Sequence, residues 1–142
     1  MSELRALLAD TTERVLANAP DWTEVEKAGL AKVLVPESEG GFGGNWEDAL
    51  VVIRACGYHA VDLPLSEAIL ESSNANDKEL FAAMMLAAKM AGALQAALDL
   101  SVEYTRQRQQ FGKPLASFQA IQQQLALFAE ETAAANAAVA AA

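Results

Sequence analysis

The sequence is poor in the residues that make covalent links and metal sites. It contains one cysteine, Cys56, and one histidine, His59. A single cysteine cannot form an internal disulfide, and the two residues together fall short of the ligand set of an ordinary zinc site. Cys56 ends an apolar run, so we expect a small residue of the core. We therefore predict no metal site, and we assign no catalytic role to either residue.

Basic residues are scarce as well. The chain of 142 residues has 10 lysines and arginines against 19 aspartates and glutamates, a formal net charge of −9. Nucleic acids and anionic membranes both select basic surfaces. The charge balance therefore argues against both kinds of partner, and we expect most of the acidic side chains to form a solvated surface.

The sequence also lacks an evident targeting or membrane-spanning pattern. Residues 1–10 do not show the basic and then apolar order of a signal peptide. The longest apolar tract, Leu80 to Leu94, contains Lys89 and is shorter than the ~20 residues that cross a bilayer. With 53% hydrophobic residues the chain can form a core. We expect a soluble protein without a membrane partner, located in the cytoplasm.

Helix signals extend along nearly the whole chain, and the fold class they predict is all-α. The first helix has Leu4, Leu7, Leu8 and Val15 on one face, behind a possible cap at Ser2. Further N-caps are predicted at Asp21, Asn45 and Asp77, and glycines predict helix ends at Gly29 and Gly57. A short helix is expected at residues 65–70, whereas residues 30–35 fit either a helix or a strand.

The second half of the sequence predicts a long helical hairpin. Residues 78 to about 110 contain no proline and repeat apolar residues at steps of three and four, which predicts one helix. Gly112 and Pro114 then stop it, Ser117 is a predicted cap, and an antiparallel second helix follows. The closing segment AAANAAVAAA has no helix-ending signal, so we expect the helix to continue beyond Ala142.

The glycine-rich segment at residues 40–46, GGFGGNW, does not match a nucleotide-binding loop. Counted from Gly41, the third glycine of G-x-G-x-x-G is replaced by Trp46, and no P-loop lysine and hydroxyl follow. A tight turn between helices explains it better.

Two other segments match one known family, in the same order along the chain. Residues 104–126, YTRQRQQFGKPLASFQAIQQQLA, contain Y-x-x-x-R-x-Q-F-G-x-P-x-x-x-x-Q, which resembles the helix-turn-helix signature of the acyl-CoA dehydrogenase family. Residues 29–44, GLAKVLVPESEGGFGG, resemble that family's G-L-x-x-L-x-V-P-E-x-x-G-G-x-G segment. Two ordered matches are more specific than either one alone, and the resemblance covers residues 20–135.

The resemblance implies a domain organisation that this chain contains only in part. Members of the family have an N-terminal helical domain, a middle β-domain and a C-terminal four-helix domain. Residues 1–70 correspond to the first and residues 78–142 to the beginning of the last. The junction at 71–77 is too short for the β-domain. We thus expect an N-terminal helical domain joined to a long antiparallel helical hairpin from an incomplete four-helix bundle.

The resemblance also implies a cofactor and partners. Family members usually assemble as tetramers that bind one FAD per subunit, so we expect FAD as the cofactor and a homo- or hetero-oligomer, a dimer or a tetramer. Arg108 matches the arginine that reaches the FAD pyrophosphate of a neighbouring subunit, Gln119 matches a glutamine that bonds the same cofactor, and Phe111 fits as the apolar wall. A guanidinium fork suits phosphate oxygens. The implied substrate is an acyl-CoA, which would be oxidised to a trans-2-enoyl-CoA with electrons passed to a further acceptor.

No catalytic residue can be carried over from the family. Its usual catalytic base lies on a later helix, and the alternative base and the coenzyme A-binding arginine align with Ala82 and Ala83. Glu79 is the nearest carboxylate in the sequence. Two alternatives to an acyl-CoA dehydrogenase therefore stay open: an inactive helical subunit that completes a partner's FAD site, or an unrelated helical interaction bundle.

Overall fold

The computed structural model describes residues 3–18 and 20–141 and confirms the all-α class. The elements are α1 (Glu3–Leu16), α2 (Trp22–Lys27), η1 (Leu30–Lys32), η2 (Glu37–Glu39), α3 (Trp46–Tyr58), α4 (Leu65–Ser72), α5 (Lys78–Gln107), β1 (Gln109–Gln110), β2 (Lys113–Pro114), η3 (Leu115–Ser117) and α6 (Gln119–Ala141). The ambiguous segment after Gly29 forms the 3₁₀ turn η1, neither an α-helix nor a strand.

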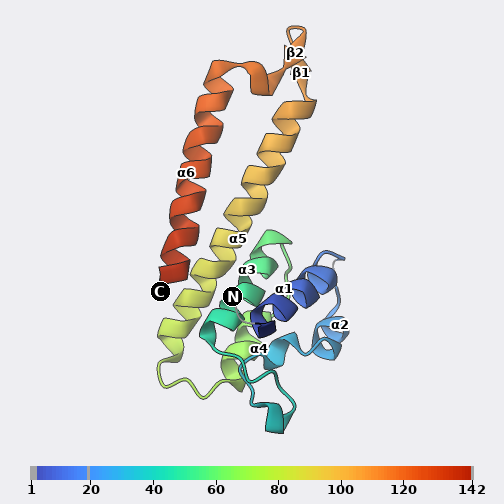
Figure 1. Ribbon diagram of the computed structural model, residues 1–142, viewed down its shortest axis with the longest axis vertical. Helices are drawn as coiled ribbons and strands as arrows, with labels where there is room; N and C mark the ends of the chain where they lie inside the picture. Colours follow the sequence, from blue (N-terminus) through green and yellow to red (C-terminus); the bar gives the residue numbers. More distant parts are fainter. Residues whose placement is uncertain (1–2, 19, 142) are drawn as a thin grey trace.

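The long helices α5 and α6 form the predicted antiparallel hairpin (Figure 1). Of the four shorter helices, α3 and α4 pack against the first half of α5, α1 packs on α3, and α2 packs beside α1; the small β1–β2 ribbon lies at the opposite tip. The second half of the hairpin therefore stands clear of the N-terminal helices. The predicted domain boundary at residues 71–77, which connect α4 to α5, stays a prediction.

Three of the predicted N-caps are confirmed. Asp21 and Asn45 each form a capping box with the residue three positions later, Glu24 and Asp48 respectively. In each box the side chain of the cap accepts from the backbone N–H of the later residue, and the later side chain accepts from the backbone N–H of the cap. Asp77 accepts from the N–H of Leu80. The cap at Ser117 was wrong: its hydroxyl donates to the Pro114 carbonyl, and α6 begins two residues later. The predicted cap at Ser2 lies outside the described residues.

One buried cluster joins the N-terminal helices to α5. Leu8 and Leu16 of α1, Ile53 of α3 and Met85 of α5 all belong to it and are at most 1% exposed. The predicted face of α1 was wrong in one position, because Leu7 is 55% exposed. The buried stripe runs instead through Leu8, Thr12 and Leu16, at steps of four residues.

Helices α3 and α5 approach so closely that only glycine fits at their contact. A Cβ atom on Gly57 of α3 would lie 1.8 Å from the carbonyl oxygen of Lys89, and one on Gly92 of α5 would lie 1.9 Å from that of Arg54. The prediction that Gly57 ends its helix was therefore wrong, since α3 continues to Tyr58. Gly57 is there because the backbone of α5 occupies the place of a side chain.

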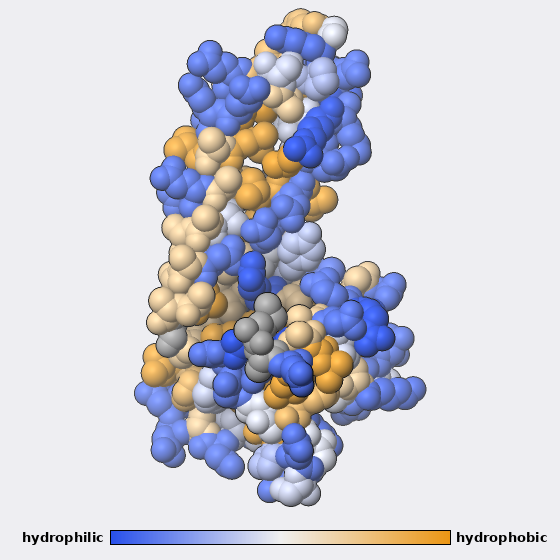
Figure 2. All heavy atoms as spheres, viewed as in Figure 1, coloured by the Kyte–Doolittle hydropathy of each residue, from blue (hydrophilic) through white to orange (hydrophobic). Residues whose placement is uncertain are grey.

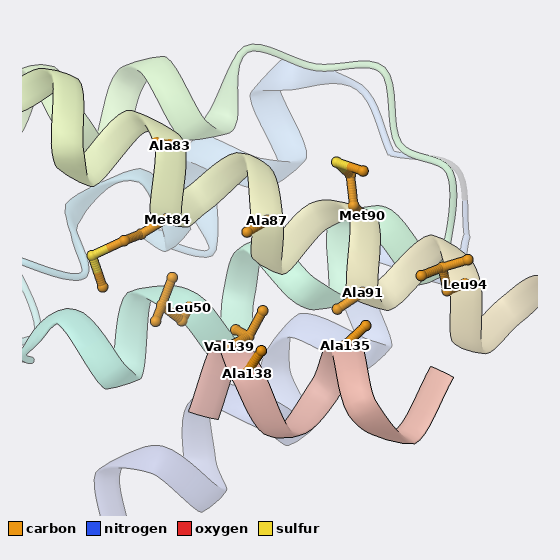
Figure 3. Close-up of a pocket in the computed structure, with 10 residues that line it drawn as sticks. All are labelled: Leu50, Ala83, Met84, Ala87, Met90, Ala91, Leu94, Ala135, Ala138 and Val139. Atoms are coloured by element: carbon orange, nitrogen blue, oxygen red, sulfur yellow. The ribbon is translucent and has the colours of Figure 1, made fainter. Parts of the chain in front are cut away.

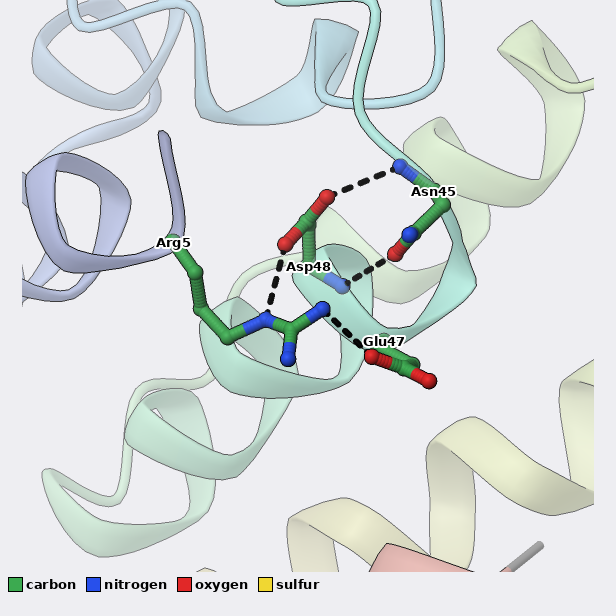
Figure 4. Close-up of polar contacts among 4 residues, drawn as sticks. All are labelled: Arg5, Asn45, Glu47 and Asp48. Atoms are coloured by element: carbon green, nitrogen blue, oxygen red, sulfur yellow. Dashed lines mark hydrogen bonds and ion pairs between the residues drawn. The ribbon is translucent and has the colours of Figure 1, made fainter. Parts of the chain in front are cut away.

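A buried carboxylate ties α1 to the start of α3. Asp48 is 3% exposed, accepts from the N–H of Asn45, and accepts from Nε of Arg5 at 2.9 Å (Figure 4). The Arg5 guanidinium also donates to Glu47. These two carboxylates, Asp48 first, raise the pKa of Arg5. Asp48, the N3 residue of the α3 capping box, is thus also the docking point for α1.

Helix α5 differs from its prediction at its C-terminal end. It stops at Gln107, three residues earlier than expected, because Gln109 and Gln110 enter the β1–β2 ribbon.

Among the described residues, α5 is the one helix long and apolar enough, by length and composition alone, to cross a membrane. A core helix passes the same test, and α5 packs against α3, α4 and α6. The absence of a membrane partner stays a prediction.

The close α3–α5 contact predicts that replacing Gly57 with alanine lowers the stability of the protein, although alanine has the higher helix propensity. Replacing a solvent-exposed helix glycine with alanine stabilises a protein by roughly 0.5–1 kcal/mol. For Gly57→Ala we expect a loss of about 1–3 kcal/mol, because the new methyl group must push two helix backbones apart. Urea unfolding followed by far-UV circular dichroism measures the free energy of unfolding of the variant and of the parent. A variant as stable as the parent would contradict the close contact.

The burial of Cys56 predicts that the protein becomes less stable at alkaline pH. Desolvation of the buried thiol raises its pKa from 9.0 to about 11. The unfolded chain therefore loses this proton first, so the free energy of unfolding should fall as the pH rises from 9 to about 11. Comparing the parent with Cys56→Ala in urea unfolding isolates this contribution. If the free energy of unfolding changes equally with pH in the two proteins, the thiol of Cys56 does not cause the loss of stability.

Candidate functional site

The family-signature segment forms a polar turn at the tip of the helical hairpin. Its two strands pair in the register Gln109 with Pro114 and Gln110 with Lys113, leaving Phe111 and Gly112 as a two-residue loop. Both loop residues have positive φ, 54° and 78°, which fits a type I′ hairpin turn. The sequence analysis missed this ribbon. Its signal was a glycine at the second loop position between two short polar pairs.

Phe111 occupies an unusual position in this turn. Its positive φ is sterically unfavourable for a residue with a side chain, and the ring is 90% exposed. Phe111 meets Phe118 edge to face at 6.2 Å between ring centroids, while Nζ of Lys113 lies 4.3 Å from the centroid of Phe118. Strained backbone that presents an exposed aromatic ring is typical of a functional surface.

Arg108 and Gln119 lie at the same end of the hairpin, at the end of α5 and the start of α6. The backbone of Arg108 is fixed, because its N–H donates to Tyr104 and its carbonyl accepts from Leu115, both at 2.8 Å. Both side chains are exposed. With Lys113 in the same turn, residues 108–119 carry two basic residues of an acidic chain. The donors available here suit an anionic ligand.

A second candidate feature is an apolar groove at the other end of the hairpin. It has a volume of about 420 Å³ and lies between α5, α6 and Leu50 of α3 (Figure 3). Its other lining residues are Ala83, Met84, Ala87, Met90, Ala91, Leu94, Ala135, Ala138 and Val139. The alanines of α6 make the space, because their methyl groups fill little of it. Such a groove suits a hydrocarbon chain and offers no charged side chain for catalysis.

Ala82 lines a separate pocket of about 270 Å³ between α4 and α5. Glu67 of α4 and Lys89 of α5 line the same pocket. Glu79 was the nearest carboxylate by sequence, but the structure brings Glu67 to the pocket that Ala82 lines. This neighbour could not be found from the sequence, because it depends on how α4 packs across α5.

The part of the chain that the structure describes contains no cluster of metal-ligating side chains. Within residues 3–18 and 20–141, no group of three or more histidine, cysteine, aspartate or glutamate side chains could hold a metal ion. Cys56 is buried, and His59 pairs with Glu13 of α1 at 2.8 Å. These two residues serve packing and helix docking.

Comparisons with known proteins agree with the signature. The family described as acyl-CoA dehydrogenase, C-terminal domain, matches residues 80–142. The acyl-CoA dehydrogenase FadE34 of Mycobacterium tuberculosis is 36% identical over 126 residues, covering 78% of this chain and 15% of that protein. The acyl-CoA dehydrogenase IpdE2 of the same organism is 48% identical over 59 residues, 42% of this chain and 19% of that protein.

A mitochondrial isovaleryl-CoA dehydrogenase of rice, Oryza sativa, is 54% identical over 43 residues, 30% of this chain and 10% of that protein. The chain thus spans less than a fifth of the length of these three relatives. No solved structure gives a significant match. The partial matches agree with one another, and all of them are to the acyl-CoA dehydrogenase family, which this chain resembles.

Proposed function

We propose that the protein serves the FAD-dependent α,β-dehydrogenation of an acyl-CoA thioester to a trans-2-enoyl-CoA, with this chain supplying helical parts of the enzyme. Similarity to the family supports acyl-CoA dehydrogenation in general terms. The observation that carries the proposal is the exposed, basic turn at residues 108–119, in which the family's signature residues lie at one tip of the molecule.

The residues of this turn fit the diphosphate of FAD. Arg108 offers a planar fork of N–H donors, and its backbone is fixed by two hydrogen bonds, so its side chain starts from a defined position. Gln119 offers a neutral amide beside it. Phe111 presents an exposed apolar ring that can shield the anion from water, which strengthens charged hydrogen bonds. When bound, the flavin supplies the hydride-accepting chemistry of the reaction.

The two pockets at the opposite end of the hairpin fit the substrate less completely. The apolar groove can enclose the hydrocarbon part of an acyl group. Ala82 and Ala83, at the family positions of a base and a coenzyme A-binding arginine, can neither move a proton nor bind a phosphate. We therefore assign no catalytic residue to this chain, and the acyl substrate and the electron acceptor are left to the complete enzyme.

Those two alanines favour a second candidate function. In it the chain is a catalytically inactive helical subunit, which presents its turn to the FAD of a partner subunit. The two functions share the flavin contact at Arg108 and differ in the source of the catalytic base. A cytoplasmic location is proposed for both.

The flavin contact can be tested by Arg108→Ala in the protein purified with its flavin. A hydrogen bond to a charged group contributes about 1.5–3 kcal/mol, so FAD retention should weaken by roughly 10- to 150-fold. Arg108→Lys should restore only part of it, because lysine supplies charge without the paired donors. Flavin absorbance after dialysis measures the loss.

Arg106→Ala is the matched control, since it removes an exposed arginine one residue from the end of α5 without touching the signature. It should keep its flavin. Circular dichroism confirms that each variant is folded. If Arg108→Ala retains FAD as tightly as the parent, the turn is a structural connection and the cofactor contact is refuted.

A further inference from the structure

The ring at the apex of the hairpin tip is held in a conformation that its own loop does not favour. A type I′ turn needs positive φ at both loop positions, which asparagine, aspartate or glycine usually provide. Phe111 has a φ of 54° and is 90% exposed, so burial of its side chain does not offset the cost of this backbone. A strained residue persists where the surrounding structure holds it. Contacts outside the loop therefore hold Phe111.

Phe118 supplies such a contact. The two rings meet edge to face, with 6.2 Å between their centroids and 78° between their planes. Phe118 is half-buried, and hydrogen bonds fix its backbone. Its N–H donates to the carbonyl of Leu115 at 3.0 Å, and its carbonyl accepts from the N–H of Gln122 at 3.1 Å. Phe118 is therefore a fixed surface against which the exposed ring of Phe111 packs.

The ammonium group of Lys113 occupies the face of the Phe118 ring. Its Nζ lies 4.3 Å from the ring centroid, inside the limit of about 6 Å for a cation–π contact. No carboxylate within the turn competes for it, because residues 104–129 contain no aspartate or glutamate. Lys113 also has no ion pair among residues 3–18 and 20–141. The contact thus joins β2 to the start of α6, beside Gln119 in the sequence.

We propose that Lys113 is a positioning residue of the flavin contact. Its ammonium holds the ring of Phe118, and Phe118 holds Phe111 in the strained conformation that presents its ring to the ligand. The inference rests on the proposed function, since the ring has an anion to shield only where the turn binds FAD. The contact between Lys113 and Phe118 belongs to the chain itself and needs no flavin.

The alternative role for this lysine is direct binding of the diphosphate, and the two roles have different consequences. An ammonium that moved to the diphosphate would leave the face of Phe118 and release the ring that supports Phe111. The position of Nζ over the ring therefore favours the positioning role. In that role the loss of Lys113 acts only through Phe118, whereas in direct binding the two residues act independently.

Proton NMR of the protein without flavin tests the contact itself. Protons of a side chain that lies over an aromatic ring are shifted upfield. The ε-protons of Lys113 should therefore resonate upfield of those of Lys78, an exposed lysine at the start of α5. Phe118→Leu should abolish this shift, because it removes the ring. Equal positions for the ε-protons of the two lysines in the parent would overturn the proposal, whether or not the turn binds FAD.

A double-mutant cycle of FAD retention, in the protein purified with its flavin, tests the effect on the ligand. Lys113→Met removes the charge and keeps the length of the side chain. It should weaken retention about two- to fivefold, the range of an exposed cation–π contact. Lys113→Arg should restore retention, because a guanidinium also packs on an aromatic face. Lys113→Met combined with Phe118→Leu should retain FAD no more weakly than Phe118→Leu alone.

Lys78→Met is the matched control, because it removes an exposed lysine at the other end of the hairpin, and it should keep its flavin. Circular dichroism confirms that each variant is folded. Unchanged retention in Lys113→Met would overturn the positioning role. Losses that multiply in the double variant would also overturn it and would show direct binding. Unchanged retention in Arg108→Ala, with the upfield shift preserved, would refute the flavin contact and with it the positioning role, while the contact between Lys113 and Phe118 stands.

Discussion

The contact between α3 and α5 is the constraint on which the rest of the structure depends. Gly57 and Gly92 let the two backbones touch, and no other residue type fits at either position without movement of a helix. This contact fixes the N-terminal helices against the first half of α5. It also determines which side of α5 stays exposed, because Leu86, Met90 and Leu100 lie on the side opposite the buried residues of that helix. Figure 2 shows hydrophobic residues exposed along the hairpin.

The polar links around this contact align the helices that it brings together. Asp48 joins α1 to the capped start of α3, His59 holds α1 near the end of α3, and Tyr58 donates to Asp99 of α5 at 3.0 Å. The Asp99 carboxylate that accepts this bond raises the pKa of Tyr58.

The two ends of the hairpin have different chemistry, and this division explains the proposed function. The tip is basic and exposed, whereas the groove at the end near α3 is lined by apolar side chains. In the function that we propose, the tip contributes to a flavin site and the groove to an acyl-binding surface, while another part of the enzyme supplies the catalytic base.

The sequence by itself determined the all-α class, the three confirmed helix caps, the long hairpin and the resemblance to the family, because each depends on local spacing or on a short motif. It placed Arg108, Phe111 and Gln119 in one segment, and their role in binding FAD stays a prediction. Only the tertiary structure decided that Gly57 packs inside a helix, that Leu7 faces solvent, that Glu67 and Ala82 line one pocket, and that Leu86 and Leu100 of α5 are exposed in the described chain. These features depend on which helix packs against which. That packing is determined by backbone contacts and by shared burial between residues that are far apart in the sequence.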